Sequence, residues 1–192
     1  MITKDILFNG VLIGTHESTG NYKKDAELVH LFLKEKGFIK TISLNDQIFG
    51  QANVFAKVAN NIYSNDLKKS PFKGSSVCPF IVNAAFSIEL YLKAINDCYG
   101  NKIRGHNLAN LYNKIPADGK SYFLKAATEL RNRYELPQGT DINTCLESLS
   151  YAFENWRYIY EHNHIETELQ SIRYTLHVSF EASCKVRENS NQ

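Results

Sequence analysis

Apolar residues recur every three to four positions along most of this chain, which is the spacing of amphipathic α-helices. The long stripes of this kind lie at 48–63, 78–99, 142–160 and 165–186. Shorter helical pieces are predicted between them, at 107–112 and 120–134. None of the long stripes alternates residue by residue, as a half-buried β-strand would. The pattern therefore predicts an all-α fold built as a bundle of helices.

The start of the chain has a different pattern. Two apolar triplets, 6–8 and 11–13, flank Asn9 and Gly10, a pair that favours the two-residue turn of a β-hairpin. A polar stretch follows, and then apolar spacing with a glycine stop predicts a short helix over 25–36. The hairpin is one interpretation of an otherwise ambiguous segment, so the structure of this region stays open.

Residues that begin or end helices divide the rest of the chain. Asp141 is well placed to cap the helix that follows it, and Gly100 can adopt the left-handed conformation that ends one. Pro116 ends the short piece that Asn107 begins. No internal repeat or long linker is present. We expect a small N-terminal extension over 1–45 and a helical bundle over 46–188.

Composition narrows the class of protein only a little. The 192 residues are 43% apolar, which argues against disorder, and the net charge of +2 is too small to indicate nucleic-acid binding by itself. No CxxC pair, metal-ligand spacing or phosphate-binding glycine loop occurs, so we expect neither a metal nor a cofactor. The sequence shows no secretory leader, and its longest apolar run is too short and interrupted to span a bilayer. The expected compartment is the cytoplasm, with all four cysteines reduced.

Basic residues gather in one part of the chain. Seven Lys and Arg against two acidic residues lie between Lys102 and Arg133. Lys102, Arg104, Arg131 and Arg133 are therefore candidates for contacting the phosphates of RNA. The alternative is an ordinary solvated helix surface, which charge alone favours.

Arg157 with two following histidines is the most suggestive chemistry in the sequence. An arginine can hold a phosphate and a histidine can move a proton near neutral pH, which together suffice to cut RNA without a metal. On an ideal helix, His162 diverges from Arg157 by about 140°, whereas His164 returns to within about 20° of it. The alternative is an exposed helix end in which Arg157 pairs with Glu154 or Glu161.

Two further polar groups have less specific patterns. Glu89 lies in a very apolar helix, where it is either a buried anchor for a basic residue such as His106 or a flank position that reaches water. Arg173, His177 and Glu181 follow one another at steps of four on the last helix. That spacing is more typical of a surface ion network than of a catalytic site.

Three segments resemble HEPN domains, a family of α-helical domains, and they keep the order of that family. Residues 83–95, which include Glu89, resemble the second helix of the domain. Residues 105–108 (Gly-His-Asn-Leu) resemble the next helix start in one bacterial branch, and residues 153–161, with Trp-Arg-Tyr, resemble a later helix of that branch. The resemblance covers about 80–162 and gives no counterpart for residues 1–45.

The resemblance implies a bundle of four or five helices that forms a homodimer. In nuclease members, an arginine and a histidine four to six residues later meet across the dimer and cut RNA without a metal. Carried over, Arg157 would hold the phosphate and His162 or His164 would be the acid and base. The implied activity is that of an endoribonuclease acting as a toxin or antiviral effector, with an antitoxin or another protein as partner.

The same resemblance leaves a second function open. Nuclease members usually have a polar residue after the arginine, and this chain has Tyr158. Arg157 would then be structural and pair with Glu89 in the core. The chain would be a non-catalytic HEPN-like module that binds a protein, a nucleotide or RNA.

Overall fold

The computed structural model describes residues 2–39, 42–150 and 168–190. The chain divides into two compact units, residues 1–43 and residues 44–192. The first is a two-stranded sheet with one helix, and the second is helical throughout its described elements. The predicted helical character is thus confirmed, and a small sheet is added to it.

The N-terminal unit begins with the hairpin that its turn sequence predicted. Strands β1 (Ile2–Phe8) and β2 (Val11–Ser18) pair antiparallel. Asn9 and Gly10 join them with φ angles of 50° and 80°, the left-handed conformation that a two-residue hairpin turn requires. Helix α1 (Tyr22–Glu35) follows, as the apolar spacing predicted.

A buried carboxylate ties the helix of this unit to its sheet. Asp25 is 6% exposed and accepts hydrogen bonds from the hydroxyl of Ser18 (2.6 Å) and from the backbone N–H of Thr19 (2.7 Å). These bonds, the one from Ser18 foremost, hold the pKa of Asp25 far below its usual range. A Cβ at Gly14 would lie 2.5 Å from the ring of Phe32, so this ring would have to shift to admit any other residue.

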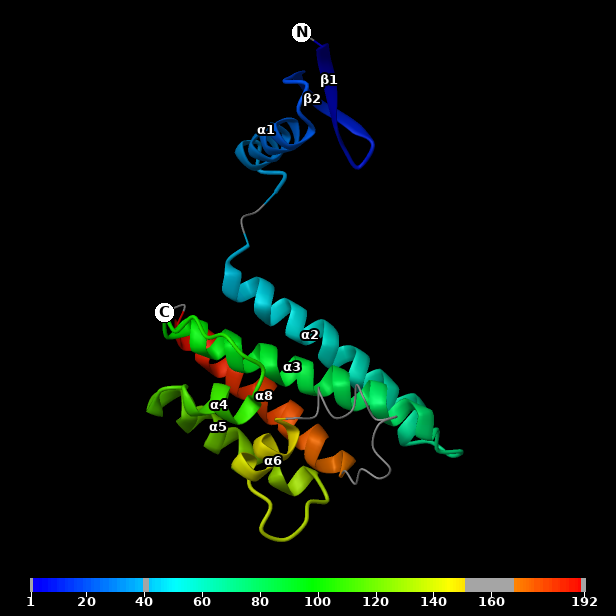
Figure 1. The fold of residues 1–192 in the computed structure, drawn as a ribbon, viewed down its shortest axis with the longest axis vertical. Coiled ribbons are helices and arrows are strands. Elements are labelled where there is room, and N and C mark those ends of the chain that lie inside the picture. The colour runs from blue at the N-terminus through cyan, green and yellow to red at the C-terminus, as the bar shows by residue number, and fades with distance from the viewer. Residues whose placement is uncertain (1, 40–41, 151–167, 191–192) are drawn as a thin grey trace. The chain divides into compact units, whose positions relative to one another are not determined.

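Three long helices form the frame of the helical unit. They are α2 (Leu44–Ile62), α3 (Val77–Cys98) and α8 (Leu169–Ser190). Figure 1 shows them side by side, and α3 packs against both α2 and α8. Three shorter helices complete the described part: α4 (Leu108–Asn113), α5 (Ala117–Leu130) and α6 (Ile142–Leu149). Of these, α5 and α6 pack on α8, and α4 bridges α3 and α6.

Local sequence sets most of these helix ends. The side chain of Asn107 accepts from the backbone N–H of Asn110 (2.9 Å), and that of Asp141 accepts from the backbone N–H of Asn143 (2.7 Å). Both residues are therefore the N-caps that their positions predicted. Gly100 follows α3 with a φ of 76°, as expected of a residue that ends a helix.

The number and length of the helices differ from expectation in one region. The prediction of a single helix over 142–160 is wrong at its middle, because α6 ends at Leu149. The hydroxyl of Ser150 donates to the carbonyl of Leu146 (2.7 Å) and accepts from the backbone N–H of Ala109 (3.0 Å), which ties the helix end to α4. The helical unit has six α-helices among its described residues, more than the four or five that the resemblance implied.

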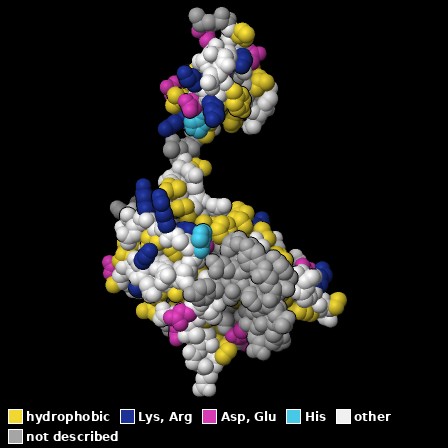
Figure 2. Space-filling model, viewed as in Figure 1, with side chains coloured by type: hydrophobic (Ala, Val, Ile, Leu, Met, Phe, Trp, Pro, Cys, Tyr) yellow, Lys and Arg dark blue, Asp and Glu magenta, His cyan; other side chains and the backbone are white. Residues whose placement is uncertain are grey.

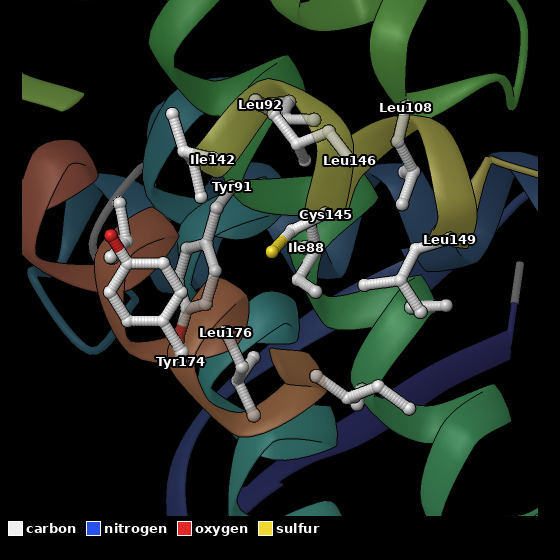
Figure 3. Packing of buried hydrophobic residues seen from close by; sticks show 14 of the residues in the cluster. Ile88, Tyr91, Leu92, Leu108, Ile142, Cys145, Leu146, Leu149, Tyr174 and Leu176 are labelled. Carbon is white, nitrogen blue, oxygen red and sulfur yellow. The ribbon is translucent and has the colours of Figure 1, made fainter. Parts of the chain in front are cut away.

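The core of the helical unit lies where α3, α6 and α8 meet. Figure 3 shows Ile88 and Tyr91 of α3, Leu146 of α6, and Tyr174 and Leu176 of α8 converging on one another, and all are 0 to 3% exposed. Each such side chain contributes about 1.5–3 kcal/mol through burial. The buried hydroxyl of Tyr174 donates to a backbone carbonyl of α5, so the core leaves it satisfied.

Helix α3 is more apolar than the sequence interpretation allowed. Within the described part of the chain, the segment Gly74–Cys98 is long and apolar enough to cross a membrane by length and composition. The prediction that every apolar run is too short and interrupted to span a bilayer is therefore wrong for this segment. In the structure, 56% of its apolar window is buried, by contacts with α2, α4 and α8. A buried core helix has the same composition.

Candidate functional site

A cavity of about 550 Å³ lies between α2 and α8, with Tyr91 of α3 also lining it. Its size is that of an ordinary small-molecule site. Polar side chains contribute much of its described lining: Asn53, Lys57, Asn60, Tyr134, Arg173 and His177. A concave site with convergent polar groups is the default location for binding or catalysis, so the chemistry of these residues decides what it can do.

Arg173 supplies a held positive charge. Its guanidinium carbon lies 4.0 Å from the ring centroid of Tyr63 and 5.4 Å from that of Tyr134, so the planar group sits against two aromatic rings. Its Nη1 donates to Gln170 (3.1 Å). Its Nε is buried and has no hydrogen-bond partner among the described residues. A buried, charged donor without an acceptor is costly, which makes Arg173 a candidate to contact an anion.

His177 connects a tyrosine to a carboxylate. Its Nδ1 is 2.8 Å from the hydroxyl of Tyr134, and its Nε2 is 3.4 Å from a carboxylate oxygen of Glu181. Burial raises the pKa of Tyr134, more than the nearby positive charges of Arg173 and Arg133 lower it. Tyr134 therefore keeps its proton near neutral pH, and when it donates that proton to Nδ1, the imidazole N–H is the one on Nε2, on the side of Glu181. A proton can move along the hydrogen bond between Tyr134 and His177, and Glu181 is close enough to stabilise a positive charge on the imidazole.

The part of the cavity near Asn53 contains two aromatic rings. Tyr91 is fully buried and donates from its hydroxyl to Oδ1 of Asn53 (2.6 Å). Burial raises the pKa of Tyr91 well above its usual value, so this hydroxyl remains a donor. The ring centroid of Phe180 lies 5.8 Å from that of Tyr91 in an edge-on arrangement.

Glu89 and His106 meet outside this cavity. Glu89 is 3% exposed, its carboxylate lies 3.1 Å from Nδ1 of His106, and it accepts from Lys93 (2.6 Å). Of the two alternatives for Glu89, the structure thus has the buried anchor that contacts His106. His106 itself is 74% exposed at its side chain. The cluster joins the loop after α3 to that helix.

The four basic residues proposed for RNA contact have different surroundings. Lys102 and Arg104 are exposed in the loop after α3. Arg131 donates to the backbone carbonyls of Thr140 and Pro137, so it holds a loop in place. On the face that Figure 2 shows, the described Lys and Arg side chains form small groups and no continuous band.

Arg133 differs from the other three in its position relative to the cavity. It is exposed, and its charge lies close enough to lower the pKa of Tyr134. It therefore adds positive potential beside the cavity that Arg173 lines.

Arg157, His162 and His164 lie outside the described residues, so their predicted roles and the proposed pairing of Arg157 with Glu89 stay predictions. Among the residues that the structure describes, no group of three or more His, Cys, Asp and Glu could hold a metal ion. None of the four cysteines, all of which lie in the described ranges, forms a disulfide, and burial raises the pKa of each thiol.

Sequence spacing found part of the cavity and missed the rest. It placed Arg173, His177 and Glu181 on one stripe of a helix but favoured a surface network for them. Tyr134 reaches His177 from 43 residues away, and nothing local indicates that contact. The available clue on α2 was the polar stripe of Asn53, Lys57 and Asn60, whose spacing of four and three places them on one face.

No family model, no curated protein and no solved structure matches the chain.

Proposed function

We propose that the helical unit is a metal-independent, HEPN-like ribonuclease and that the cavity between α2 and α8 is where it acts. The observation that carries the proposal is the convergence of Arg173, His177 and Tyr134. An arginine, a histidine with an oriented proton and a hydroxyl are what phosphodiester cleavage needs when a metal does not take part. The three segments that resemble HEPN domains support the same class of activity.

In the proposed reaction, the ribose 2′-oxygen attacks the adjacent phosphorus. The 2′-hydroxyl proton passes to Tyr134 as Tyr134 passes its own proton to Nδ1 of His177, and Glu181 stabilises the imidazolium that forms. Arg173 holds the charge that develops on the phosphate. The bond from phosphorus to the 5′-oxygen breaks, and Lys57, which lines the cavity from α2, protonates that oxygen. The products are a 2′,3′-cyclic phosphate and a 5′-hydroxyl.

Cleavage of labelled RNA by the full chain in EDTA tests the proposal. We expect His177→Ala and Arg173→Ala each to lower the rate about 10²–10⁴-fold, the usual contribution of an acid–base group or a charge-stabilising contact. His106→Ala is the matched control, because it removes an exposed histidine outside the cavity. Circular dichroism checks that each variant is folded. Wild-type protein that cleaves no RNA in any oligomeric state would refute the proposal.

The motif at Arg157 is tested in the same assay. His162→Ala combined with His164→Ala removes both histidines that its spacing offers. Loss of cleavage in this double variant, with cleavage retained in His177→Ala, would move the chemistry from the cavity to Arg157. The opposite result assigns it to His177.

A second function, a non-catalytic binding module, has one observation in its favour. Both ring nitrogens of His177 are engaged, by Tyr134 and by Glu181. A histidine held in this way can serve as a fixed part of a binding wall. RNA binding without cleavage, measured by fluorescence anisotropy, would favour this alternative.

The proposal also covers the oligomeric state of the protein, its compartment and its partners. We infer a cytoplasmic homodimer whose partner is RNA, with an antitoxin or another protein as regulator, because the resembled family is organised in this way. Light scattering coupled to size-exclusion chromatography gives the oligomeric state directly. A monomer at micromolar concentration would contradict the dimer.

A further inference from the structure

The cavity lies along α2 and α8, which run antiparallel, and different side chains line its two ends. Gln170 near the start of α8 donates to Tyr63, just after the end of α2 (3.2 Å), whereas Arg187 near the end of α8 donates to Asn45 at the start of α2 (2.9 Å). Arg173 therefore lies at one end of the cavity and Phe180 toward the other. Phe180 is seven positions after Arg173, which corresponds to two helical turns or about 10 Å.

We infer that the end at Asn53 and Phe180 is a base-recognition subsite, which binds an unpaired nucleobase whose phosphate lies at Arg173. The inference rests on the proposed RNA-cleaving function and specifies its substrate as single-stranded RNA with one base turned out of the stack. A length of about 10 Å and a volume of about 550 Å³ accommodate one nucleotide with its phosphate, sugar and base.

Phe180 supplies the surface for stacking. Its ring is half-buried, and it is braced by Tyr91 (5.8 Å between centroids) and by Phe49 (6.3 Å, nearly parallel). A braced aromatic ring that is not fully covered is the platform on which proteins stack single-stranded bases. Stacking alone tolerates every base, so a polar group is needed for selection.

Asn53 supplies that polar group with a fixed orientation. Its Oδ1 accepts from the hydroxyl of Tyr91 (2.6 Å), and burial raises the pKa of Tyr91, so this hydroxyl keeps the proton that it donates. The amide NH₂ is therefore the end of Asn53 left to contact a ligand, and it donates to an acceptor on the base edge. The exposed amides of Asn60 and Asn61 line the same wall of the cavity.

Binding of adenosine 5′-monophosphate and of ribose 5-phosphate to the full chain tests the subsite. The two probes share the sugar and a phosphate but differ in the base. We expect the nucleotide to bind at least about tenfold more tightly, which is the lower part of the range that stacking one base provides. Isothermal titration calorimetry or ligand-observed NMR measures both affinities. Equal affinities would overturn the inference.

Two variants assign the difference to named residues. Phe180→Ala removes the stacking ring, and Asn53→Asp keeps the acceptor for Tyr91 while it removes the donor. Each variant should reduce the preference for the nucleotide severalfold. Phe180→Ala should also leave the affinity for ribose 5-phosphate nearly unchanged. Phe72→Ala is the matched control, because that ring is 57% exposed and does not line the cavity. A wild-type preference in both variants would place the base elsewhere.

These outcomes separate the inference from the proposed function. RNA cleavage that depends on His177, together with equal binding of the two probes, would refute the subsite alone. Preferential nucleotide binding by a protein that cleaves no RNA would refute the nuclease and retain the subsite.

Discussion

Replacing Glu89 by Gln tests how much a buried ion pair contributes to the helical unit. The carboxylate is 4% exposed at its side chain and accepts from Lys93, which is 21% exposed, over 2.6 Å. Gln has the same shape and keeps an acceptor, so the substitution removes the charge without opening a cavity. His106 lies within 3.2 Å of both carboxylate oxygens but is 74% exposed, so water can replace most of its contribution.

The expected magnitude follows from the change in hydrogen-bond type. A hydrogen bond that involves a charged group contributes about 1.5–3 kcal/mol, and in the variant the ammonium of Lys93 is still charged but its acceptor is neutral, so the bond moves from the upper to the lower end of that range. The bond from Lys93 therefore loses about 1–1.5 kcal/mol, and the exposed pair with His106 adds at most a few tenths. We expect Glu89→Gln to lower the free energy of unfolding by about 1–2 kcal/mol. For a unit of this size, that lowers Tm by roughly 2–8 °C.

Urea and thermal unfolding of the full chain, followed by circular dichroism at a helix-sensitive wavelength, measure the change. The matched control is Glu188→Gln, which breaks a similar helical pair with Lys185 (2.9 Å) whose side chains are 58% and 61% exposed. We expect that control to cost less than about 0.5 kcal/mol. Equal effects of the two substitutions would refute the argument that burial sets the contribution. A loss well above 2 kcal/mol would indicate a further partner of Glu89, and a double-mutant cycle with Arg157→Gln would identify it.

Two further predictions concern the packing around two glycines and the loss of stability at low pH. Gly119→Ala should destabilise the chain by about 1–3 kcal/mol, because the added Cβ would lie 2.5 Å from Ile115 and 2.9 Å from Tyr99, whereas Gly50→Ala in α2, with nothing within 4 Å, should stabilise it by about 0.5–1 kcal/mol. Thermal melts that moved in the same direction for both would contradict this packing. The lowered pKa of Asp25 means that its contribution to stability is complete above the unfolded pKa of about 3.9 and disappears as pH falls through the folded value. The amide resonance of Thr19 in NMR spectra should report this loss in the wild type, and an unchanged acid transition in Asp25→Asn would show that Asp25 does not cause it.

The sequence by itself determined the elements of this fold, because their causes are local. Apolar spacing of three and four residues located the helices, and Asn107, Asp141 and Gly100 set ends that depend only on neighbouring backbone groups. The turn at Asn9 and Gly10 needs left-handed backbone at two successive residues, which this pair accepts more readily than most. Each of these features depends on a few residues that are adjacent in the chain.

Tertiary structure decided where the polar side chains meet. Spacing placed Arg173 and His177 on one helix face, but it could not show that the face lines a cavity with Tyr134 and with Asn53 of α2. It left Glu89 between core and solvent, and the packing of α3 made it the buried partner of Lys93 and His106. It also continued a helix past Leu149, where a hydrogen bond between Ser150 and the start of α4 ties down the end.

The physical reason is the distance over which each interaction acts. A cap, a turn or an amphipathic stripe is complete within about one or two helical turns, so its residues can be identified from their spacing. A cavity is formed by the packing of helices that are far apart in the chain, and its chemistry depends on which face of each helix remains uncovered after the core has formed. The hydrogen bond between Tyr134 and His177, which joins segments 43 residues apart, is such a product of packing.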